Sequence, residues 1–435
     1  MLLRGRVGHR GSAELAANLL APAASDAIAS SHFGVVPFFV LMGFLAAEAG
    51  LGRDAFDVAN ALFRRLRGGL GVGTVGADAI LAAITGISIA SAAVFTRIAV
   101  PQMIRHGYAR RFAVGVVAGS SVMGMLIPPS LLLILYGIVA EQAIGALFLA
   151  GIGPGLLTTA LFGLGVVVAA PVWPARVRPQ AGAVPEGLSG PQVAAKGLPI
   201  AALVPFVLGG LYGGPFTPVE AGTMGAIGAL AIGAAKRRLT PAGLGRVLVE
   251  TGLVTAAMCF LIVAAQMHAR MLAFSGVPAG IGAFAAQADL GFWGPVALYL
   301  GAVVAMGTIL DSSAILLIVV PLILPVVQPM GIDLVWFGIV TVIAVEIGLL
   351  TTPFGISVYV IHSALDDPSI PLSEISAGAA PFALIMLIVL GLAVAFPPIA
   401  TALLREEAPW PDASWTSPWP SSPASPPTRR TWRPT

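Results

Sequence analysis

Charged residues are scarce in this chain. Its 435 residues include only 23 Lys and Arg and 20 Asp and Glu, whereas 57% are hydrophobic and the mean hydropathy is +0.94. Such a composition leaves too little polar surface to cover a water-soluble globule, so it predicts a polytopic protein of the lipid bilayer. The net charge of +3 is small and the basic residues stand in short loop clusters, which favours topology signals over a nucleic-acid-binding surface.

Cysteine and the common catalytic motifs are also missing or nearly so. The single cysteine, Cys259, lies inside an apolar segment, which excludes a disulfide scaffold and a cysteine-rich metal site. The sequence contains no His-Glu-x-x-His pattern, no Gly-x-Ser-x-Gly elbow and no P-loop. We therefore expect no enzymatic activity, no ATP hydrolysis by this chain and no cofactor.

What the chain does contain is a succession of long apolar segments, and a helix needs about 20 residues to cross a bilayer. The segments are 33–51, 69–85, 112–139, 143–170, 198–213, 217–235, 247–274, 291–309, 333–363 and 377–404. Two more, 86–103 and 310–327, follow a preceding span without a polar loop, so we predict that they are re-entrant hairpins. The expected fold is all-α, with about ten to eleven transmembrane helices plus these two hairpins.

The polar segments between the spans divide the chain into predicted parts. These are an atypical N-terminus with no visible first helix (1–32), a first repeat (33–170), a polar linker (171–197), a second repeat (198–404) and a disordered tail rich in Pro, Ser and Trp (405–435). Within the first repeat, the segment from Asp54 to Arg67 sets Ala55, Ala59, Leu62 and Leu66 on one helical face. We expect this segment to lie in the membrane interface.

An internal repeat relates the two halves of the chain. Ser88, Pro101, Gly107, Gly124 and Pro129 recur 224 positions later as Ser312, Pro325, Gly331, Gly348 and Pro353. The loop 105–111 carries three arginines, whereas its equivalent 328–333 carries one acid and no basic residue, so the positive-inside rule puts the loops on opposite sides. This contrast predicts an inverted-topology repeat. The segments above place six spans between equivalent points, which would preserve the orientation, so the inversion requires one span boundary, or one element at the N-terminus, to differ.

Prolines at the equivalent positions predict a pair of ion-binding sites. Proline interrupts a helix and frees backbone carbonyls, which is tolerated at membrane depth where protein or a watery cavity satisfies them. Carbonyl and hydroxyl oxygens can hold sodium without a carboxylate, so Ser88 with the break 126–130, and Ser312 with the break 350–354, form the predicted pair. The ion-binding candidates are Ser88, Ile127, Pro128, Ser312, Thr351 and Thr352. The substrate-path candidates are Gly86, Pro129, Asp311 and Pro353.

Several ionisable residues leave two interpretations open. Asp311 is either an ion or substrate contact or a helix cap at the start of the second hairpin. Glu220 follows Thr217 and Pro218 in a pattern that fits a capping box. Glu346 stands in the middle of a span, where a charge is costly, and belongs either to a transport path or to a packed contact between helices.

Several motifs together resemble one transporter family. They are Gly68-Gly69-Leu70, Gly86-Ile87-Ser88, Leu126-Ile127-Pro128-Pro129-Ser130, Gly151-Ile152-Gly153-Pro154-Gly155-Leu156, the segment from Gly213 to Ala221, and Leu310-Asp311 followed by Pro321 and Pro325. In this order, from about 35 to 400, the chain resembles the large membrane subunit, DctM type, of tripartite ATP-independent periplasmic (TRAP) transporters. The resemblance implies a sodium-driven, elevator-type importer of organic acids in the bacterial inner membrane.

The same resemblance implies partners for this chain. They are a small four-helix membrane subunit of the DctQ type and a periplasmic solute-binding protein of the DctP type. The main alternative is a stand-alone ion-coupled carboxylate carrier with the same repeat, and copurification with a small membrane subunit would separate the two. A structural membrane scaffold is a third possibility, but it would leave the duplicated breaks unexplained.

Overall fold

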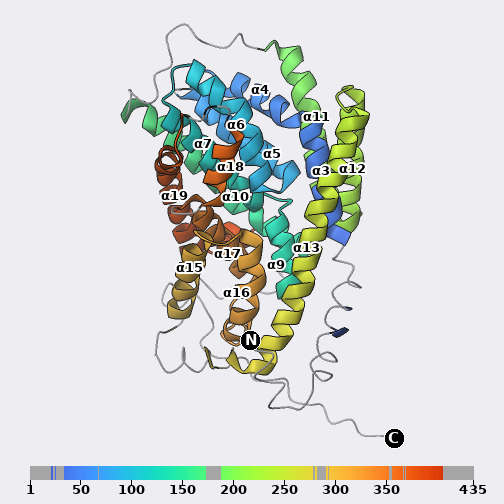
Figure 1. Cartoon of the computed structure of the whole chain (residues 1–435), viewed down its shortest axis with the longest axis vertical. Helices are drawn as coiled ribbons and strands as arrows, with labels where there is room; N and C mark the ends of the chain where they lie inside the picture. Colours follow the sequence, from blue (N-terminus) through green and yellow to red (C-terminus); the bar gives the residue numbers. More distant parts are fainter. Residues whose placement is uncertain are drawn as a thin grey trace, which may run out of the picture.

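The computed structural model is built of helices joined by turns (Figure 1). It describes residues 21–22, 25, 34–66, 68–172, 188–277, 280–281, 291, 293–351, 355–365, 367 and 369–404, and no strand occurs among them. The all-α class predicted from composition is therefore confirmed. The predicted tail, 405–435, and most of the atypical N-terminus, 1–32, lie outside the described residues.

Seventeen helices follow one another along the described part of the chain. In the first half they are α3 (Val35–Glu48), α4 (Leu51–Phe63), α5 (Gly69–Thr85), α6 (Ser88–Arg105), α7 (Arg110–Ser121), α8 (Met123–Leu126), α9 (Leu131–Ala140) and α10 (Ile144–Val172). In the second half they are α11 (Gly190–Tyr212), α12 (Pro218–Ala235), α13 (Pro241–Ser275), α15 (Trp293–Gly307), α16 (Ser312–Val327), α17 (Leu334–Leu350), α18 (Ile356–Ala364), α19 (Leu372–Ala395) and α20 (Pro398–Thr401).

Membrane-length helices are fewer than the apolar segments of the sequence. Among the described residues, six helical segments are long and apolar enough to cross a bilayer, or seven if α3 and α4, which are bent by 64°, form one broken span. Four shorter apolar helices, α5, α15, α16 and α17, accompany them. The chain is thus a multi-pass membrane protein, and the breaks that shorten its helices account for the difference from the ten to eleven spans expected.

Two predicted boundaries differ from the structure. The last eight residues of the predicted linker 171–197 are helical, because Ser189 and Gln192 form a capping box that starts α11 at Gly190. The predicted interfacial segment from Asp54 to Arg67 is also displaced, since α4 begins at Leu51 and ends at Phe63. Its predicted apolar face is only partly buried.

The sequence repeat is also a repeat of helices. Shifting α5, α6, α7–α8, α9 and α10 by 224 positions superposes their ranges, within four residues at each end, on α15, α16, α17, α18 and α19. Backbone conformations recur as well. Gly107 and Gly331 both have a positive φ, of 85° and 72°. Ile127 and Thr351 both end a helix in an extended conformation. The backbone therefore repeats even where the side chains between the landmarks differ.

The predicted hairpins need a correction. Segments 86–103 and 310–327 are not hairpins by themselves, because α6 and α16 are each one continuous helix despite the prolines inside them. Each helix instead packs against the helix before it, α6 against α5 and α16 against α15. The turn of the first pair falls at Gly86, whose φ of 63° ends α5 in the left-handed conformation that glycine adopts without strain.

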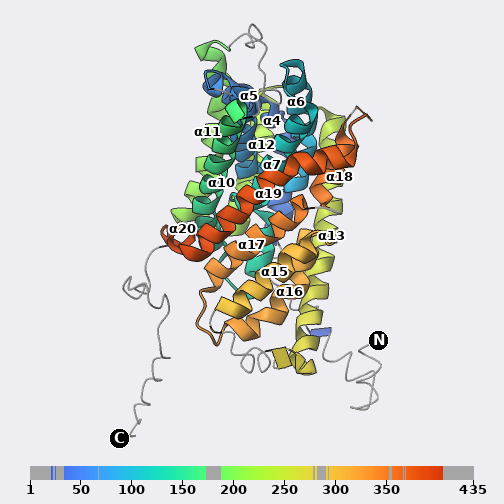
Figure 2. The same ribbon diagram turned by 90° about the vertical axis from the view of Figure 1, so that its left-hand side faces the viewer.

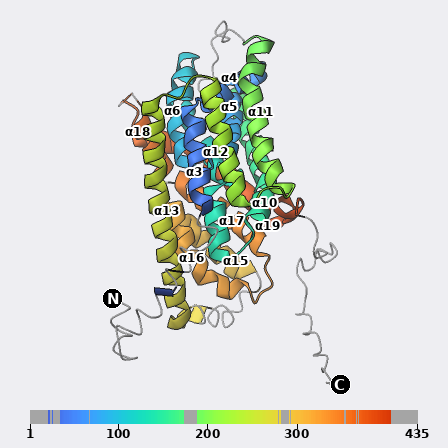
Figure 3. The same cartoon turned by 90° about the vertical axis from the view of Figure 1, so that its right-hand side faces the viewer.

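The two helix pairs lie at opposite ends of the molecule. Figures 1 and 2 show α5 and α6 near the top and α15 and α16 near the bottom, with α17 between them. This placement is what an inverted repeat requires, while the orientation of the pairs across a membrane stays a prediction. On another side, α3, α11, α12 and α13 stand side by side along the long axis (Figure 3).

The core is centred on α17. Every residue from Trp336 to Leu350 is buried, so this helix has no face left for lipid. It packs against α9 and α10 of the first repeat and against α15 and α19 of the second. The Tyr136 hydroxyl of α9 donates to the Leu334 carbonyl at 2.7 Å, and the Trp336 indole N–H donates to the Ala393 carbonyl at 2.9 Å. The two repeats thus share one interior.

Candidate functional site

The turn between α5 and α6 packs against the break after α8. The backbone N–H of Leu131 donates to the Gly86 carbonyl at 3.1 Å. A side chain at Gly86 would collide with the Pro129 carbonyl, and a Cβ at Gly124 would lie 2.9 Å from the Ser88 nitrogen. Both glycines are thus required by close approach of the two backbones. The structure therefore places Gly86 against Pro129, and Ser88 against Gly124 and Val122, just before the predicted break 126–130.

Ser88 links the two repeats. Its side chain is completely buried, and its hydroxyl donates to a carboxylate oxygen of Glu346, on α17, at 3.1 Å. The Val122 carbonyl lies 3.4 Å from the same hydroxyl. Glu346 is also completely buried, and its second carboxylate oxygen has no hydrogen-bond partner among the described residues. A hydroxyl, a carbonyl and a carboxylate thus converge at the tip of the α5–α6 pair.

Ser130 makes the hydrogen bonds of the break between α8 and α9. Residues 127–130 join α8 to α9, with a cis peptide bond between Pro128 and Pro129. Ser130 caps α9, since its hydroxyl accepts from the Leu133 N–H at 3.3 Å and donates to the Met125 carbonyl, one of those that the break frees. On the other side, α10 passes so closely that a Cβ at Gly151 would lie 2.9 Å from the Leu126 carbonyl.

The second repeat has a related arrangement with fewer contacts. Asp311 caps α16, because its carboxylate accepts from the Ser313 N–H at 2.9 Å, so the cap interpretation is confirmed. Ser312 is buried, and its hydroxyl has no partner in the described part of the chain. A Cβ at Gly307 would lie 2.8 Å from the Gly348 Cα, so α15 and α17 touch through their backbones.

The second break is described only in part. The Thr351 hydroxyl donates to the Ile347 carbonyl at 2.7 Å, which keeps it within its own helix. Thr352 and Pro353, the other two candidates of this break, lie outside the described residues. Ser312 and Thr351 are both described, and no hydrogen bond joins them. The first break, with its contacts around Ser88, is therefore better defined than the second.

The structure defines the contacts of two further ionisable residues. Glu220 forms the capping box of α12, since its carboxylate accepts from the Thr217 N–H at 2.8 Å. Glu346 contacts Ser88 of the other repeat, which fits both of its interpretations, a packed contact between helices and a place in the candidate site. The site prediction did not include Glu346, because nothing local in the sequence pairs it with a residue 258 positions away. Its signal was a carboxylate in the middle of an apolar span.

A second residue that the site prediction missed is Asp54, at the start of α4. Its carboxylate is completely buried and pairs with Lys236 at 2.6 Å and with Arg238 at 2.8 Å, in the loop after α12. Lys196 of α11 lies 4.0 Å away. This cluster joins α4 to α11 and α12, so its role is structural and separate from the Ser88 tip.

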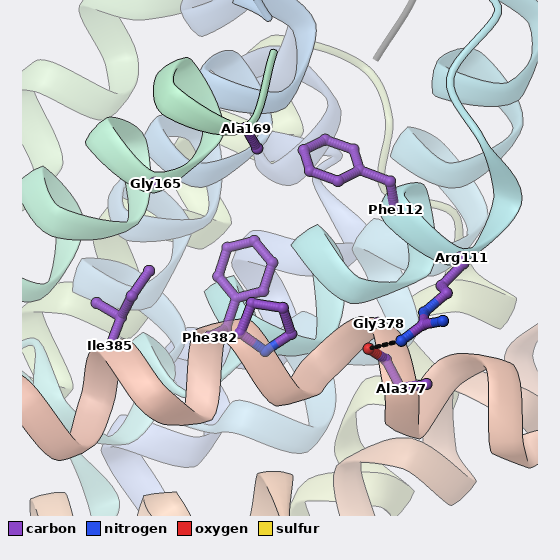
Figure 4. A pocket seen from close by; sticks show the side chains of 9 residues that line it. Arg111, Phe112, Gly165, Ala169, Ala377, Gly378, Phe382 and Ile385 are labelled. Atoms are coloured by element: carbon purple, nitrogen blue, oxygen red, sulfur yellow. Dashed lines mark hydrogen bonds between the residues drawn. The ribbon is translucent and has the colours of Figure 1, made fainter. Parts of the chain in front are cut away.

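One open pocket among the described residues lies elsewhere. It is formed by α7, α10 and α19, and it is lined mainly by apolar side chains such as Phe112, Phe382 and Ile385 (Figure 4). Arg111 stands at its edge and donates to the Ala377 carbonyl at 3.0 Å. It contains none of the predicted site residues, so we assign no role in ion binding to it.

The donor set at the Ser88 tip suits a hard cation. Hydroxyl, carbonyl and carboxylate oxygens are ligands for ions such as sodium, whereas zinc and other transition metals prefer His and Cys. In the described ranges, no group of three or more His, Cys, Asp or Glu side chains could hold a metal ion. The fold is that of a multi-pass membrane protein with two repeats, each interrupted by a helix break, which is the architecture of secondary transporters.

Comparison with known proteins identifies the family. Residues 11–399 match the family model described as "Tripartite ATP-independent periplasmic transporter, DctM component". The chain belongs to this family, so it is a component of a transporter and not an enzyme. The match begins at residue 11, earlier than the start near 35 inferred from the motifs.

Two relatives and one solved structure illustrate the likeness. The C4-dicarboxylate TRAP transporter large permease protein DctM of Pseudomonas aeruginosa is 31% identical over 377 residues, which are 86% of this chain and 87% of the relative. The isethionate TRAP transporter permease protein DctMQ of Oleidesulfovibrio alaskensis is 33% identical, over 78% of this chain and 53% of that protein. The Alcanivorax borkumensis YdaH transporter has a similar fold, with a TM-score of 0.59 at 17% identity over 90% of this chain and 91% of that one.

Proposed function

We propose that this chain is the membrane subunit of a sodium-coupled importer of a small organic acid, and that sodium binds at the paired breaks. The observation that carries the proposal is the contact of buried Ser88 with both the Val122 carbonyl and the Glu346 carboxylate. A buried carboxylate without a basic partner is costly, and a bound cation offsets that cost. The repeat offers a second site at Ser312, whose hydroxyl lacks a partner within the described ranges.

The substrate class rests on the relatives and on helix electrostatics. The relatives compared above are named for C4-dicarboxylates and for isethionate, both small organic anions. Helices α6 and α16 start at the tips of their pairs, at Ser88 and Ser312, and the N-terminal end of a helix favours a negative charge. The tips are therefore suited to an anionic solute next to the cation that accompanies it.

The partners and the mechanism are inferred in the same way. We propose a small membrane subunit and a periplasmic binding protein as partners, since the matched family is one component of a tripartite system. The transport step is proposed to be an elevator movement. The Ser88 tip is bonded to α17, which is buried on all sides and packs on both repeats, so the site can move as one body. The stand-alone carrier is the competing function.

Sodium binding can be tested without knowing the solute. The purified chain is heated in sodium chloride and in choline chloride at equal ionic strength, and its unfolding temperature is recorded. A ligand that binds only the folded state stabilises it by about 2.7 kcal/mol at a concentration of 100 Kd. We expect a higher unfolding temperature in sodium, with a saturating dependence on concentration. Equal unfolding temperatures in the two salts would contradict the proposal.

The partners require a separate experiment. A tagged chain is expressed from its own genomic neighbourhood and purified in mild detergent, and the proteins that copurify are identified by mass. We expect a small membrane protein at equal stoichiometry, and uptake into liposomes that requires an added periplasmic binding protein. Uptake by the chain alone would favour the stand-alone carrier.

A further inference from the structure

A second buried carboxyl group lies in the same helix pair but away from the Ser88 tip. Asp78, in the middle of α5, is completely buried. Ser120 of α7, also completely buried, lies with its hydroxyl 2.6 Å from one carboxyl oxygen of Asp78. Ser91 of α6 lies beside the same carboxyl group. The three residues come from three different helices, and all three side chains are completely buried.

The group is not saturated by the protein. The second carboxyl oxygen of Asp78 and the hydroxyl of Ser91 are buried and lie beside each other, but neither has a hydrogen bond of good geometry within the described ranges. Buried polar atoms are almost always paired, so two unpaired oxygens at one place point to a ligand that satisfies them. The ligand has to be positive, because a lone buried carboxylate is strongly unfavourable.

The repeat shows that the three residues form a set. Their equivalents, 224 positions later, are Ala302, Ile315 and Ala344, which are all apolar. The second repeat has the same helices there, so the fold does not need polar residues at these positions. The whole set is present in one repeat and absent from the other. All three residues are buried, so the difference between the repeats lies in the core and not on the surface.

In the part of the chain that the structure describes, no basic side chain neutralises Asp78. The charged residues on the helices that pack against α5 are Glu48 of α3, Arg53, Asp54 and Asp57 of α4, Arg97 and Arg105 of α6, Arg110 and Arg111 of α7, and Lys196 of α11. Glu48, Asp54, Asp57, Arg110 and Lys196 have ion pairs of their own. Arg53, Arg97, Arg105 and Arg111 are exposed. Tyr108 meets the backbone of Leu70 and Gly71, two turns before Asp78.

We propose that Asp78, Ser91 and Ser120 form a proton-binding site, in which the carboxyl group of Asp78 carries the proton in the folded protein. The distance of 2.6 Å between Asp78 and Ser120 is that of a direct O–H···O hydrogen bond. The proton makes Asp78 a neutral acid, whose O–H then finds an acceptor in an adjacent hydroxyl. The neutral acid holds α5, α6 and α7 together behind the Ser88 tip.

The bound proton predicts a loss of stability at alkaline pH. In the unfolded chain an aspartate titrates near its ordinary value of about 3.9, so above that pH the folded protein holds one proton more. The stability contributed by this proton therefore falls as the pH rises, and it is lost when the folded group deprotonates. Uptake and unfolding temperature should decline together, because both depend on a packed α5–α6 pair.

Infrared difference spectroscopy of the purified chain at neutral pH tests the site directly. A protonated carboxyl group has a C=O stretching band that an ionised one lacks, and we expect this band to lose intensity in Asp78→Asn but not in the control Asp367→Asn, which removes an exposed loop carboxylate. Ser120→Ala should keep the band and shift its frequency, because one hydrogen bond is lost. An unchanged band in Asp78→Asn would overturn the proposal.

Two further measurements distinguish a bound proton from a bound sodium ion and from an empty site. The unfolding temperature of the unmutated chain should fall more steeply with rising pH than that of Asp78→Asn, whose amide cannot ionise. Parallel slopes would overturn the proposal. Exchanging choline for sodium should leave the Asp78 band in place, whereas its loss would make this a sodium site instead. None of these readouts requires transport, so failure here and failure of sodium coupling are distinguishable.

Discussion

At the scale of single residues, buried polar contacts form the candidate site and contribute part of the stability. Glu346 and Asp54 both have buried carboxylates, but with different partners. Ser88 meets an acid without a basic neighbour in the described structure, so the pair suits a mobile cation. Asp54 meets two fixed cations of the chain itself, so it suits permanent attachment of one helix group to another.

Replacing the site serines should weaken sodium binding. Ser88→Ala and Ser312→Ala each remove one hydroxyl oxygen from a predicted site, and one polar contact is worth about 1 kcal/mol. We expect the sodium concentration for half-maximal stabilisation or uptake to rise about threefold to tenfold in each variant. Ser363→Ala, which removes an exposed hydroxyl of α18, is the matched control and should leave it unchanged. A normal sodium dependence in Ser88→Ala would remove Ser88 from the site.

The Asp54 cluster should be one of the most sensitive positions outside the site. Asp54→Ala leaves Lys236 and Arg238 without their buried partner, and breaking a buried ion pair costs about 3–5 kcal/mol. Asp57→Ala, which removes the half-buried partner of Lys196, should cost about 1 kcal/mol or less. Thermal unfolding of the two purified variants measures the contrast. Equal losses of stability in the two variants would show that burial of the Asp54 carboxylate does not set the strength of its ion pairs.

At the scale of elements, glycines set how closely helices approach. The two repeats meet where α7 crosses α19, and a Cβ on Gly115 or Gly378 would collide with the backbone of the other helix. Where two backbones touch, no flexible side chain can move aside to make room for a new one. These glycines therefore tolerate substitution less well than ordinary core positions. The α15–α17 contact at Gly307 and Gly348 follows the same rule.

The crossing of α7 and α19 provides a test with an internal control. Gly115→Ala forces the two helices apart, and overpacking of this kind costs about 1–3 kcal/mol. Gly391→Ala, in α19, adds a Cβ with nothing within 4 Å, so helix propensity predicts no loss or a gain of about 1 kcal/mol. Unfolding temperatures of the two variants give the comparison. A stable Gly115→Ala protein would mean that the crossing can widen at no cost.

At the scale of the whole molecule, the repeat decides the orientation. The helix pairs α5–α6 and α15–α16 stand at opposite ends (Figure 2), and three arginines mark the loop after α6 but not the loop after α16. Both observations fit loops on opposite sides of the membrane.

Single cysteines can verify this orientation. Gly107 and Gly331 have positive φ, so substitution there is strained, and their neighbours His106 and Met330 are the better positions. In a Cys259→Ala background, we expect His106→Cys to react with an impermeant thiol reagent only from the cytoplasmic side. Met330→Cys should react only from the periplasmic side. Labelling of both from the same side would refute the inverted repeat.

Local features of the sequence by themselves determined the class of the protein, the repeat at 224 residues and the caps of α12 and α16, because composition, proline, glycine and capping residues act on their neighbours. The sequence also paired Ser88 with the 126–130 break; in the structure Gly86 packs against Pro129 there, while the Ser88 hydroxyl contacts Val122 and Glu346. Only the tertiary structure decided that Glu346 joins Ser88, that Ser120 joins Asp78 and that Asp54 joins Lys236. These pairs are 258, 42 and 182 residues apart, and their meeting depends on how whole helices pack.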